Sequence, residues 1–186
     1  MIVCPSIKLH IFVFLVLALM LAGKKLIALI AMDQQRGIWY QWKIPWDVQE
    51  DLQYFRACIA DKTIVMGRKT YESIYTIYQS QYPHIHGHPR ARCNIIVSHT
   101  AIPDALVAHT IDQVIDLCDD DQLRIIGGSQ IFSLFSDYID TILMTHIQGF
   151  YPADTFFPLF EDQFDLVEDR IWSDARCRFC VYQRST

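Results

Sequence analysis

Apolar segments of two kinds alternate along this chain, and that alternation limits the fold more than any other feature of the sequence. Runs long enough for buried strands occur at Leu26–Met32, Thr63–Met66, Asn94–Ser98 and Leu123–Ile126. Between them lie segments whose apolar residues recur at the spacing of an amphipathic helix. This order predicts an α/β sheet with mostly parallel strands and flanking helices. Three later strand candidates predict an antiparallel C-terminal edge: Thr141–Ile147, Phe164–Val167 and Phe179–Tyr182.

Capping residues locate the starts of two of the helices. Asp47 and Glu50 form a capping-box-like pair, and the segment that follows has apolar residues at helical spacing: Val48, Leu52, Phe55 and Ile59. Thr110 and Gln113 form a second pair of this kind, ahead of an apolar helix face. Further helices are expected from near Thr70 and over Ile131–Phe135. The stretch Tyr75–Ala91 contains two prolines and a glycine and is predicted to be a long surface loop.

Length and composition favour one globular domain. The chain has 186 residues, of which 52% are hydrophobic and 20% charged, so a disordered or low-complexity protein is excluded. The formal net charge of −5 and the lack of a basic cluster argue against a nucleic-acid partner. Six scattered cysteines predict reduced thiols and a cytoplasmic fold. The lone Cys177–Cys180 pair is interpreted as structural because no second pair completes a zinc site.

The first 23 residues stand apart from this pattern. Ile11–Ala22 is an uninterrupted apolar run of twelve residues, which is short for a bilayer span. It is compatible with a membrane anchor, with a weak signal peptide, or with residues upstream of the true start. We therefore expect a domain over residues 24–186 in the cytoplasm, with inner-membrane tethering as the alternative. Any membrane contact is expected only through residues 1–23.

Three features have the chemistry of a binding or catalytic site. Asp51 falls at the border of the apolar face of its helix, where a carboxylate must pair, bind a polar ligand or raise its pKa, although a simple helix-dipole role is also open. The segment Gly67–Thr70 joins a strand to a helix start and carries two cations, which suits an anionic ligand. Gly127–Ser129 is a second strand-to-helix turn of glycines, a weaker signal.

Three histidines alternate within the predicted long loop: His84, His86 and His88. Alternate spacing can place imidazoles on one face of a strand, so a metal site is one interpretation. A polar loop is favoured because no carboxylate partner accompanies the histidines. We therefore predict no metal ion.

Taken in order, the segments resemble the dihydrofolate reductase family from Lys25 to the C-terminus. The resemblance rests on eight segments: Leu29–Met32, Ile44–Trp46, Asp51–Phe55, Val65–Ile74, Arg92–Ser98, Ile126–Phe132, Met144–Ile147 and Asp154–Pro158. Each is weak alone, but eight in the family's order and near its spacing are specific. The resemblance implies that family's three-layer fold and a reaction in which NADPH reduces 7,8-dihydrofolate to tetrahydrofolate. It also implies a small-molecule substrate and a monomer.

The resemblance assigns roles to matching residues. Asp51 is the expected pterin-anchoring carboxylate, with Thr145 supporting it and Trp46 beside it holding an ordered water. The slot for the pterin and nicotinamide is expected to be lined by Leu29, Ala31, Ile44, Tyr54, Phe55 and Ile74. Arg92 matches the arginine that takes the α-carboxylate of the folate tail, a natural bidentate pairing.

The cofactor residues follow from the same resemblance. Arg68, with Ser98 and His99, is expected at the 2′-phosphate of NADPH, which is why NADPH is preferred over NADH. The remaining cofactor contacts are expected from Ala31, Ile38, Gly67, Lys69, Thr70, Gly127, Gly128, Ser129, Gln130, Ile131 and Phe132.

Several residues depart from the family pattern. Trp39 replaces a usual glycine in the loop that closes over the nicotinamide, and a bulky residue adopts positive φ only at a cost. Phe132 replaces a commoner tyrosine, and a longer histidine-containing insert separates Ile74 from Arg92. The Trp39 loop and the apolar extension motivate one alternative function, a membrane-tethered paralogue that binds pterin or NADPH but turns over poorly. A second alternative is a same-fold NADPH reductase of another pterin or a ribosylated pyrimidine, although Asp51, Thr145 and Arg92 favour folate itself.

Overall fold

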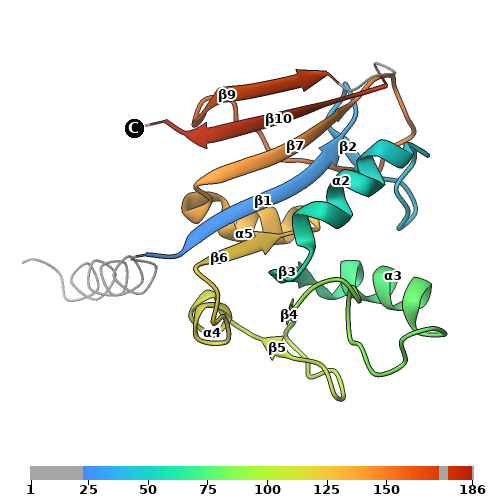
Figure 1. Ribbon diagram of the computed structural model, residues 1–186, viewed down its shortest axis with the longest axis vertical. Coiled ribbons are helices and arrows are strands. Elements are labelled where there is room, and N and C mark those ends of the chain that lie inside the picture. Colours follow the sequence, from blue (N-terminus) through green and yellow to red (C-terminus); the bar gives the residue numbers. More distant parts are fainter. Residues whose placement is uncertain (1–22, 172–175, 186) are drawn as a thin grey trace, which may run out of the picture.

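The computed structural model describes residues 23–171 and 176–185, so the apolar run at Ile11–Ala22 lies outside the described residues. Within these two ranges, no helix combines the length and the apolar character needed to cross a membrane. The described chain contains one large sheet, a small two-stranded sheet and helices packed against them (Figure 1).

Eight strands form the large sheet, in the order β5-β4-β3-β6-β1-β7-β10-β9. Their bounds are Lys25–Met32 (β1), Thr63–Gly67 (β3), Cys93–Val97 (β4), Val107–Ala108 (β5), Gln122–Ile125 (β6), Thr141–Ile147 (β7), Phe164–Ile171 (β9) and Cys177–Arg184 (β10). The pairs from β5 to β7 are parallel, whereas β10 is antiparallel to β7 and β9. The predicted mixed α/β sheet with an antiparallel C-terminal edge is therefore confirmed.

Helices cover both faces of this sheet, which makes three layers. The helices are Gln49–Ile59 (α2), Arg68–Tyr78 (α3), Ile111–Asp116 (α4) and Ser129–Phe135 (α5), followed by a 3-10 turn at Ser136–Tyr138 (η1). Alternate residues of β1 separate into different cores: Leu26 and Ala28 pack in the cluster that contains Phe132 of α5, whereas Leu29 packs with Tyr54 of α2. This period of two is the geometry of a strand buried on both faces.

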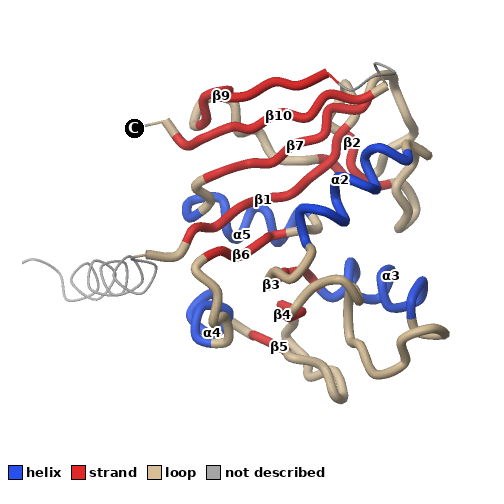
Figure 2. The backbone as a smooth tube through the Cα atoms, viewed as in Figure 1, coloured by secondary structure: helices blue, strands red, loops and turns tan. Residues whose placement is uncertain are grey.

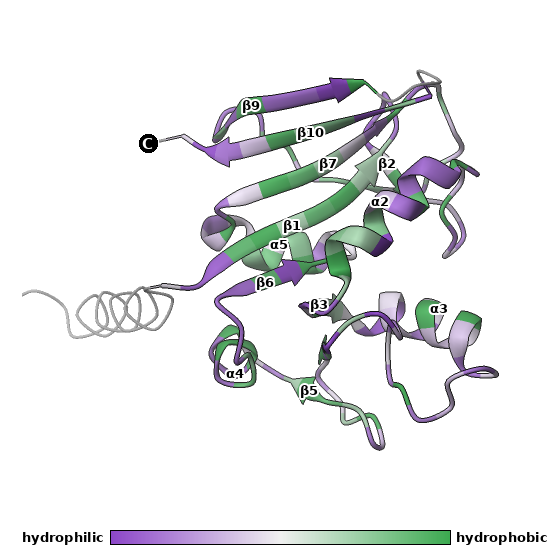
Figure 3. Cartoon of the chain, in the orientation of Figure 1, coloured by the Kyte–Doolittle hydropathy of each residue, from purple (hydrophilic) through white to green (hydrophobic). Residues whose placement is uncertain are grey.

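Hydropathy follows the position of each strand in the sheet (Figure 3). The central strands β1 and β7 are largely apolar, whereas the edge strand β9 is largely hydrophilic and mostly exposed. A polar edge strand discourages pairing with other chains. The buried, apolar centre is the part of the sheet that supports the site.

Two of the local predictions are wrong. The helix after Asp47 begins at Gln49 with Val48 at its N-cap and no side-chain cap, because the Asp47 carboxylate instead accepts a hydrogen bond from the Gln49 side chain. The segment from Tyr75 is predicted to begin a loop, but α3 extends through Tyr78. The ring of Tyr75 stacks on that of Tyr71, one turn earlier in the helix. The loop that joins α3 to β4 therefore covers residues 79–92 (Figure 2).

The small sheet pairs Gly37–Trp39 (β2) with Thr155–Phe156 (β8), two strands too short to have been predicted. Trp39 lies in β2 and is not among the described residues with positive φ. Gln41 (φ 48°) and Trp42 (φ 65°) adopt positive φ instead. The positive φ anticipated at Trp39 is therefore adopted by Gln41 and Trp42 instead.

Candidate active site

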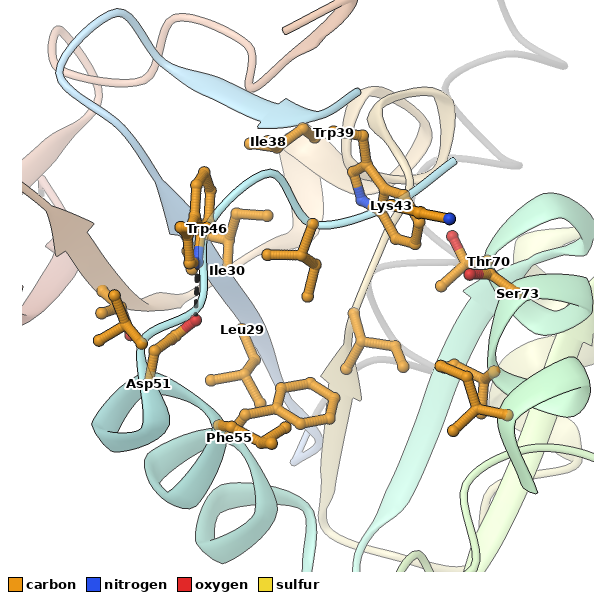
Figure 4. Close-up of a pocket in the computed structure, with 18 of the residues that line it drawn as sticks. Leu29, Ile30, Ile38, Trp39, Lys43, Trp46, Asp51, Phe55, Thr70 and Ser73 are labelled. Carbon is orange, nitrogen blue, oxygen red and sulfur yellow. Dashed lines mark hydrogen bonds between the residues drawn. The ribbon is translucent and has the colours of Figure 1, made fainter. Parts of the chain in front are cut away.

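A cavity that contains Asp51 lies beside the carboxyl ends of β1, β7 and β6, the usual position of ligands in α/β sheets (Figure 4). We call it the principal cavity because of this carboxylate. Its volume is about 320 Å³, which is within the range of small-molecule pockets. The sequence-predicted residues that line it are Leu29, Ala31, Ile38, Ile44, Trp46, Asp51, Tyr54, Phe55, Thr70, Ile74 and Thr145. These residues come from β1, β2, β7, α2, α3 and the segment between β2 and α2.

Asp51 is the buried carboxylate of this cavity. It lies in the first turn of α2 with 8% of its surface exposed, although the cavity around it is mostly apolar. The indole Nε1 of Trp46 donates a hydrogen bond to its Oδ2 across 3.2 Å, the dashed line in Figure 4. Burial raises the pKa of Asp51, while hydrogen bonds from Trp46 and Thr145 oppose that rise.

The supporting residues are placed by the sheet. Thr145 of β7 pairs with Ala31 of β1, so both lie at the same level of the sheet. The ring of Tyr54 packs at a tilt against Phe179 of β10, with 4.3 Å between ring centroids, which anchors α2 to the sheet. An acidic side chain held in an apolar slot by two donors can bind a polar heterocycle and share a proton with it.

A second cavity of about 780 Å³ lies along the starts of α3 and α5. The sequence-predicted residues that line it are Gly67, Arg68, Lys69, Thr70, Ser98, His99, Gly128, Ser129, Gln130 and Ile131. Thr100 and His109 join them. Although the chain has a net charge of −5, the residues lining this cavity include two cations and two histidines but no carboxylate. The cavity is therefore suited to an anionic ligand.

The donors of this cavity fit a phosphate-bearing dinucleotide such as NADPH. The N-caps of α3 and α5 are Gly67 and Gly128, and neither helix has a side-chain cap. The first amides of α3 can therefore donate to phosphate oxygens, and the helix dipole favours the negative charge. Arg68 hydrogen-bonds Thr100 and forms an ion pair with Glu72, which holds its guanidinium at the rim.

The two cavities adjoin. Trp39, Trp42 and Thr70 line both, so a ligand in one lies next to a ligand in the other. Trp42 is also tied to α3, because the Ser73 hydroxyl donates to its carbonyl oxygen at 3.2 Å and the Lys69 ammonium lies 4.2 Å from its ring centroid. In the sequence, the only indication of this junction is Trp39, which replaces the family's usual glycine and lines both cavities.

Three predicted site residues line neither cavity. Arg92 forms an ion pair with Asp120, whose carboxylate also accepts hydrogen bonds from Thr63, so the structure does not place Arg92 with the substrate residues. Phe132 is 1% exposed and packs edge-on against Phe157 in the core. Gly127 contributes backbone beneath that ring.

Residues that the sequence did not assign also line the principal cavity, notably Lys43, Ser73, Ile77, Tyr78 and His88. Of the alternating histidines, His86 hydrogen-bonds Tyr71 and stacks on Tyr75, whereas His88 enters the cavity wall. Across residues 23–171 and 176–185, no group of three His, Cys, Asp or Glu side chains is placed to hold a metal ion.

Known proteins of one family match this chain. A family model described as dihydrofolate reductase matches residues 25–184. A dihydrofolate reductase of Bacillus subtilis (strain 168) is 33% identical over 141 residues, covering 72% of this chain and 76% of the relative. A dihydrofolate reductase of Staphylococcus haemolyticus is 30% identical over 139 residues, covering 73% of this chain and 77% of the relative.

A solved structure agrees on the fold. Dihydrofolate reductase from Enterococcus faecalis, complexed with NADP(H) and RAB-propyl, superposes with a TM-score of 0.73. It is 23% identical and covers 88% of this chain and 98% of its own. Together with the family match over residues 25–184, these likenesses show that the chain belongs to the dihydrofolate reductase family.

Proposed function

We propose that this protein reduces 7,8-dihydrofolate to 5,6,7,8-tetrahydrofolate with NADPH. The observation that carries the proposal is the buried carboxylate of Asp51, held by Trp46 and Thr145 in an otherwise apolar cavity. A carboxylate in this setting suits the amidine-like edge of a pterin ring. Membership of the dihydrofolate reductase family supports the same substrate.

In the proposed reaction, Asp51 orients the pterin and favours its protonation at N5. Because its pKa is raised, this carboxyl is protonated more readily near neutral pH than an exposed aspartate. The Thr145 hydroxyl fixes the carboxylate, and Trp46 helps hold an ordered water beside it. Apolar cavity residues such as Leu29 and Phe55 would keep bulk water away from the ring.

The second cavity is the proposed NADPH site. The bound cofactor would supply a hydride to C6 of the substrate. Arg68, with Ser98 and His99, is proposed to bind its 2′-phosphate, and Lys69 with the first amides of α3 its pyrophosphate. Support for this assignment comes from the carboxylate-free lining and from the relative that is complexed with NADP(H). The shared lining at Trp39 and Thr70 would bring nicotinamide and pterin together.

The proposal assigns this activity to one domain, residues 24–186, acting on a small molecule as a monomer in the cytoplasm. Residues of this chain line both cavities. Residues 1–23 remain the proposed location of any membrane contact.

The deciding experiment is oxidation of NADPH by the purified protein in the presence of dihydrofolate. Loss of NADPH absorbance that requires dihydrofolate and stops on addition of a tight antifolate is expected. A ribosylated pyrimidine and a non-folate pterin serve as competing substrates. Faster turnover of either competitor, or tight antifolate binding without turnover, contradicts the proposal and favours the corresponding alternative.

A further inference from the structure

His88 lines the principal cavity and carries a buried ring nitrogen that has no hydrogen-bond partner among the described residues. The residue lies in the loop 79–92, and only 3% of its surface is exposed. The nitrogen without a partner is Nε2. A buried polar atom without a partner is rare and costly, so it indicates a ligand at that point.

The other ring nitrogen identifies Nε2 as a donor. The backbone N–H of Arg90 donates to Nδ1 of His88 across 3.2 Å, so Nδ1 carries a lone pair and the neutral ring carries its hydrogen on Nε2. Burial, together with the charges of Arg56 and Arg90, lowers the pKa of His88 to about 4. At physiological pH the side chain is therefore a neutral N–H donor.

The ring is held in a fixed position. The Asn94 side chain accepts a hydrogen bond from the His88 backbone N–H at 2.8 Å and donates to the His88 carbonyl oxygen at 3.3 Å. The rings of Phe55 and Tyr78 pack edge-on, with centroids 5.8 Å and 4.9 Å away. Gly87 has φ +133°, and a Cβ there would lie 2.2 Å from Asn94 Oδ1, so only glycine fits beside the clamp.

The His88 ring packs edge-on against Phe55, and both residues line the same cavity as Asp51. Phe55 follows Asp51 by about one turn of α2, roughly 6 Å along the helix axis. A ligand anchored at Asp51 therefore reaches His88 with the part that projects past Phe55. The arginine expected for that part, Arg92, is engaged by Asp120 and does not line the cavity.

We infer that the Nε2–H of His88 donates a hydrogen bond to an oxygen of the substrate's aminobenzoyl-glutamate tail, and that this contact makes His88 a specificity-determining residue. The inference rests on the proposed function for the identity of the substrate. Arg56 and Arg90 make the surroundings of the ring positive, which favours a carboxylate oxygen as the acceptor. In this inference the loop 79–92 recognises the tail, through the neutral Nε2–H of His88.

The test compares binding of dihydrofolate with binding of a 7,8-dihydropterin that lacks the tail, measured by quenching of tryptophan fluorescence. His88→Phe keeps an aromatic ring between Phe55 and Tyr78 but removes the donor. We expect dihydrofolate to bind this variant about tenfold more weakly and the tail-less pterin to bind unchanged. His88→Gln, which retains an N–H donor, is expected to lose no more than about threefold. His84→Phe, at an exposed position of the same loop, is the matched control.

Each outcome separates the two claims. Unchanged dihydrofolate binding by His88→Phe, or an equal loss for both compounds, overturns the role of His88 and leaves the proposed function intact. Failure of the unaltered protein to bind either compound overturns the proposed function itself. Arg92→Leu is measured alongside. If Arg92→Leu binds dihydrofolate more weakly but the tail-less pterin normally, and His88→Phe binds both normally, then Arg92 and not His88 recognises the tail.

Discussion

The indole Nε1 of Trp46 lies 3.2 Å from Oδ2 of Asp51, and each of these residues has only 8% of its surface exposed. Trp46 precedes α2 and Asp51 lies in its first turn, so the contact fixes the carboxylate against the segment that leads into the helix. The pair is therefore preorganised before any ligand arrives, which is a requirement for efficient use of a charged group.

Removing the charge of Asp51 tests its proposed role in turnover. Asp51→Asn keeps the size of the side chain but cannot hold a proton for the pterin, so kcat/KM for dihydrofolate is expected to fall about 100- to 10,000-fold. The dissociation constant of NADPH should change less than about twofold, because Asp51 does not line the second cavity. Glu50→Gln, which alters an adjacent carboxylate outside both cavities, is the control. Normal turnover by Asp51→Asn contradicts the assignment.

The same substitution has a predicted effect on stability. Because the pKa of Asp51 is raised in the folded protein, the folded state binds more protons than the unfolded state at pH values between the unfolded and folded pKa. The free energy of unfolding therefore falls as pH rises through that window. Asp51→Asn should unfold at higher denaturant concentration than the parent at pH 7, with the difference shrinking near pH 4. If the stability difference between Asp51→Asn and the parent stays constant from pH 4 to pH 7, then the pKa of Asp51 is not raised by burial.

The sequence predicts the sheet well because burial on two faces leaves long apolar runs. The strands β1, β3, β4, β6 and β7 follow such runs and agree with prediction within one or two residues at either end. The shorter strands β2, β5 and β8 have two or three residues each, too few to show a period. The Asp47 cap failed because a neighbouring glutamine competes for the carboxylate.

The site was only partly predictable for a related reason. Residues on regular elements, such as Asp51 and Thr145, reach the cavity because the element fixes their direction. Arg92 precedes β4 at the end of an insert, and the nearby Asp120 decides where its guanidinium goes. His88 enters the cavity wall through a loop whose path depends on the Asn94 clamp. Neither contact leaves a local signal in the sequence.

Gly127 is predicted to stabilise the fold at the base of α5. Its φ is +106°, and a Cβ at this position would lie 2.8 Å from the ring of Phe132, which is itself fully packed. Gly127→Ala should lower the free energy of unfolding by about 1–3 kcal/mol, measured by urea denaturation. Gly128→Ala is the matched control, because its Cβ would meet only Thr70 Oγ1, at 3.7 Å. Equal stability of the two variants contradicts this account.

Arg68 is predicted to set the preference for NADPH over NADH. Arg68→Gln removes the cation proposed for the 2′-phosphate, so KM for NADPH should rise about tenfold or more while KM for NADH stays nearly constant. Steady-state kinetics with both cofactors provide the measurement. Arg170→Gln removes an arginine of β9 that lines neither cavity and should change neither constant. A parallel rise for both cofactors would show that Arg68 acts without regard to the 2′-phosphate.

His88 is predicted to make stability depend on pH. A histidine in the unfolded chain has a pKa near 6.5, whereas burial lowers the pKa of His88 to about 4 in the folded protein. Between these values the unfolded chain binds more protons, so the free energy of unfolding rises with pH and falls on acidification, by at most about 1.4 kcal/mol per pH unit for one group.

Urea denaturation of the parent and of His88→Gln at several pH values between 4 and 7 measures this contribution, because subtraction cancels the groups common to both proteins. The pKa of His146 is also lowered by burial, so the parent alone would not isolate His88. The parent should lose more stability than His88→Gln as pH falls through this range. Parallel curves for the two proteins would mean that the His88 ring takes up a proton in the folded state as readily as in the unfolded chain, and that it is not the neutral donor inferred from its contacts.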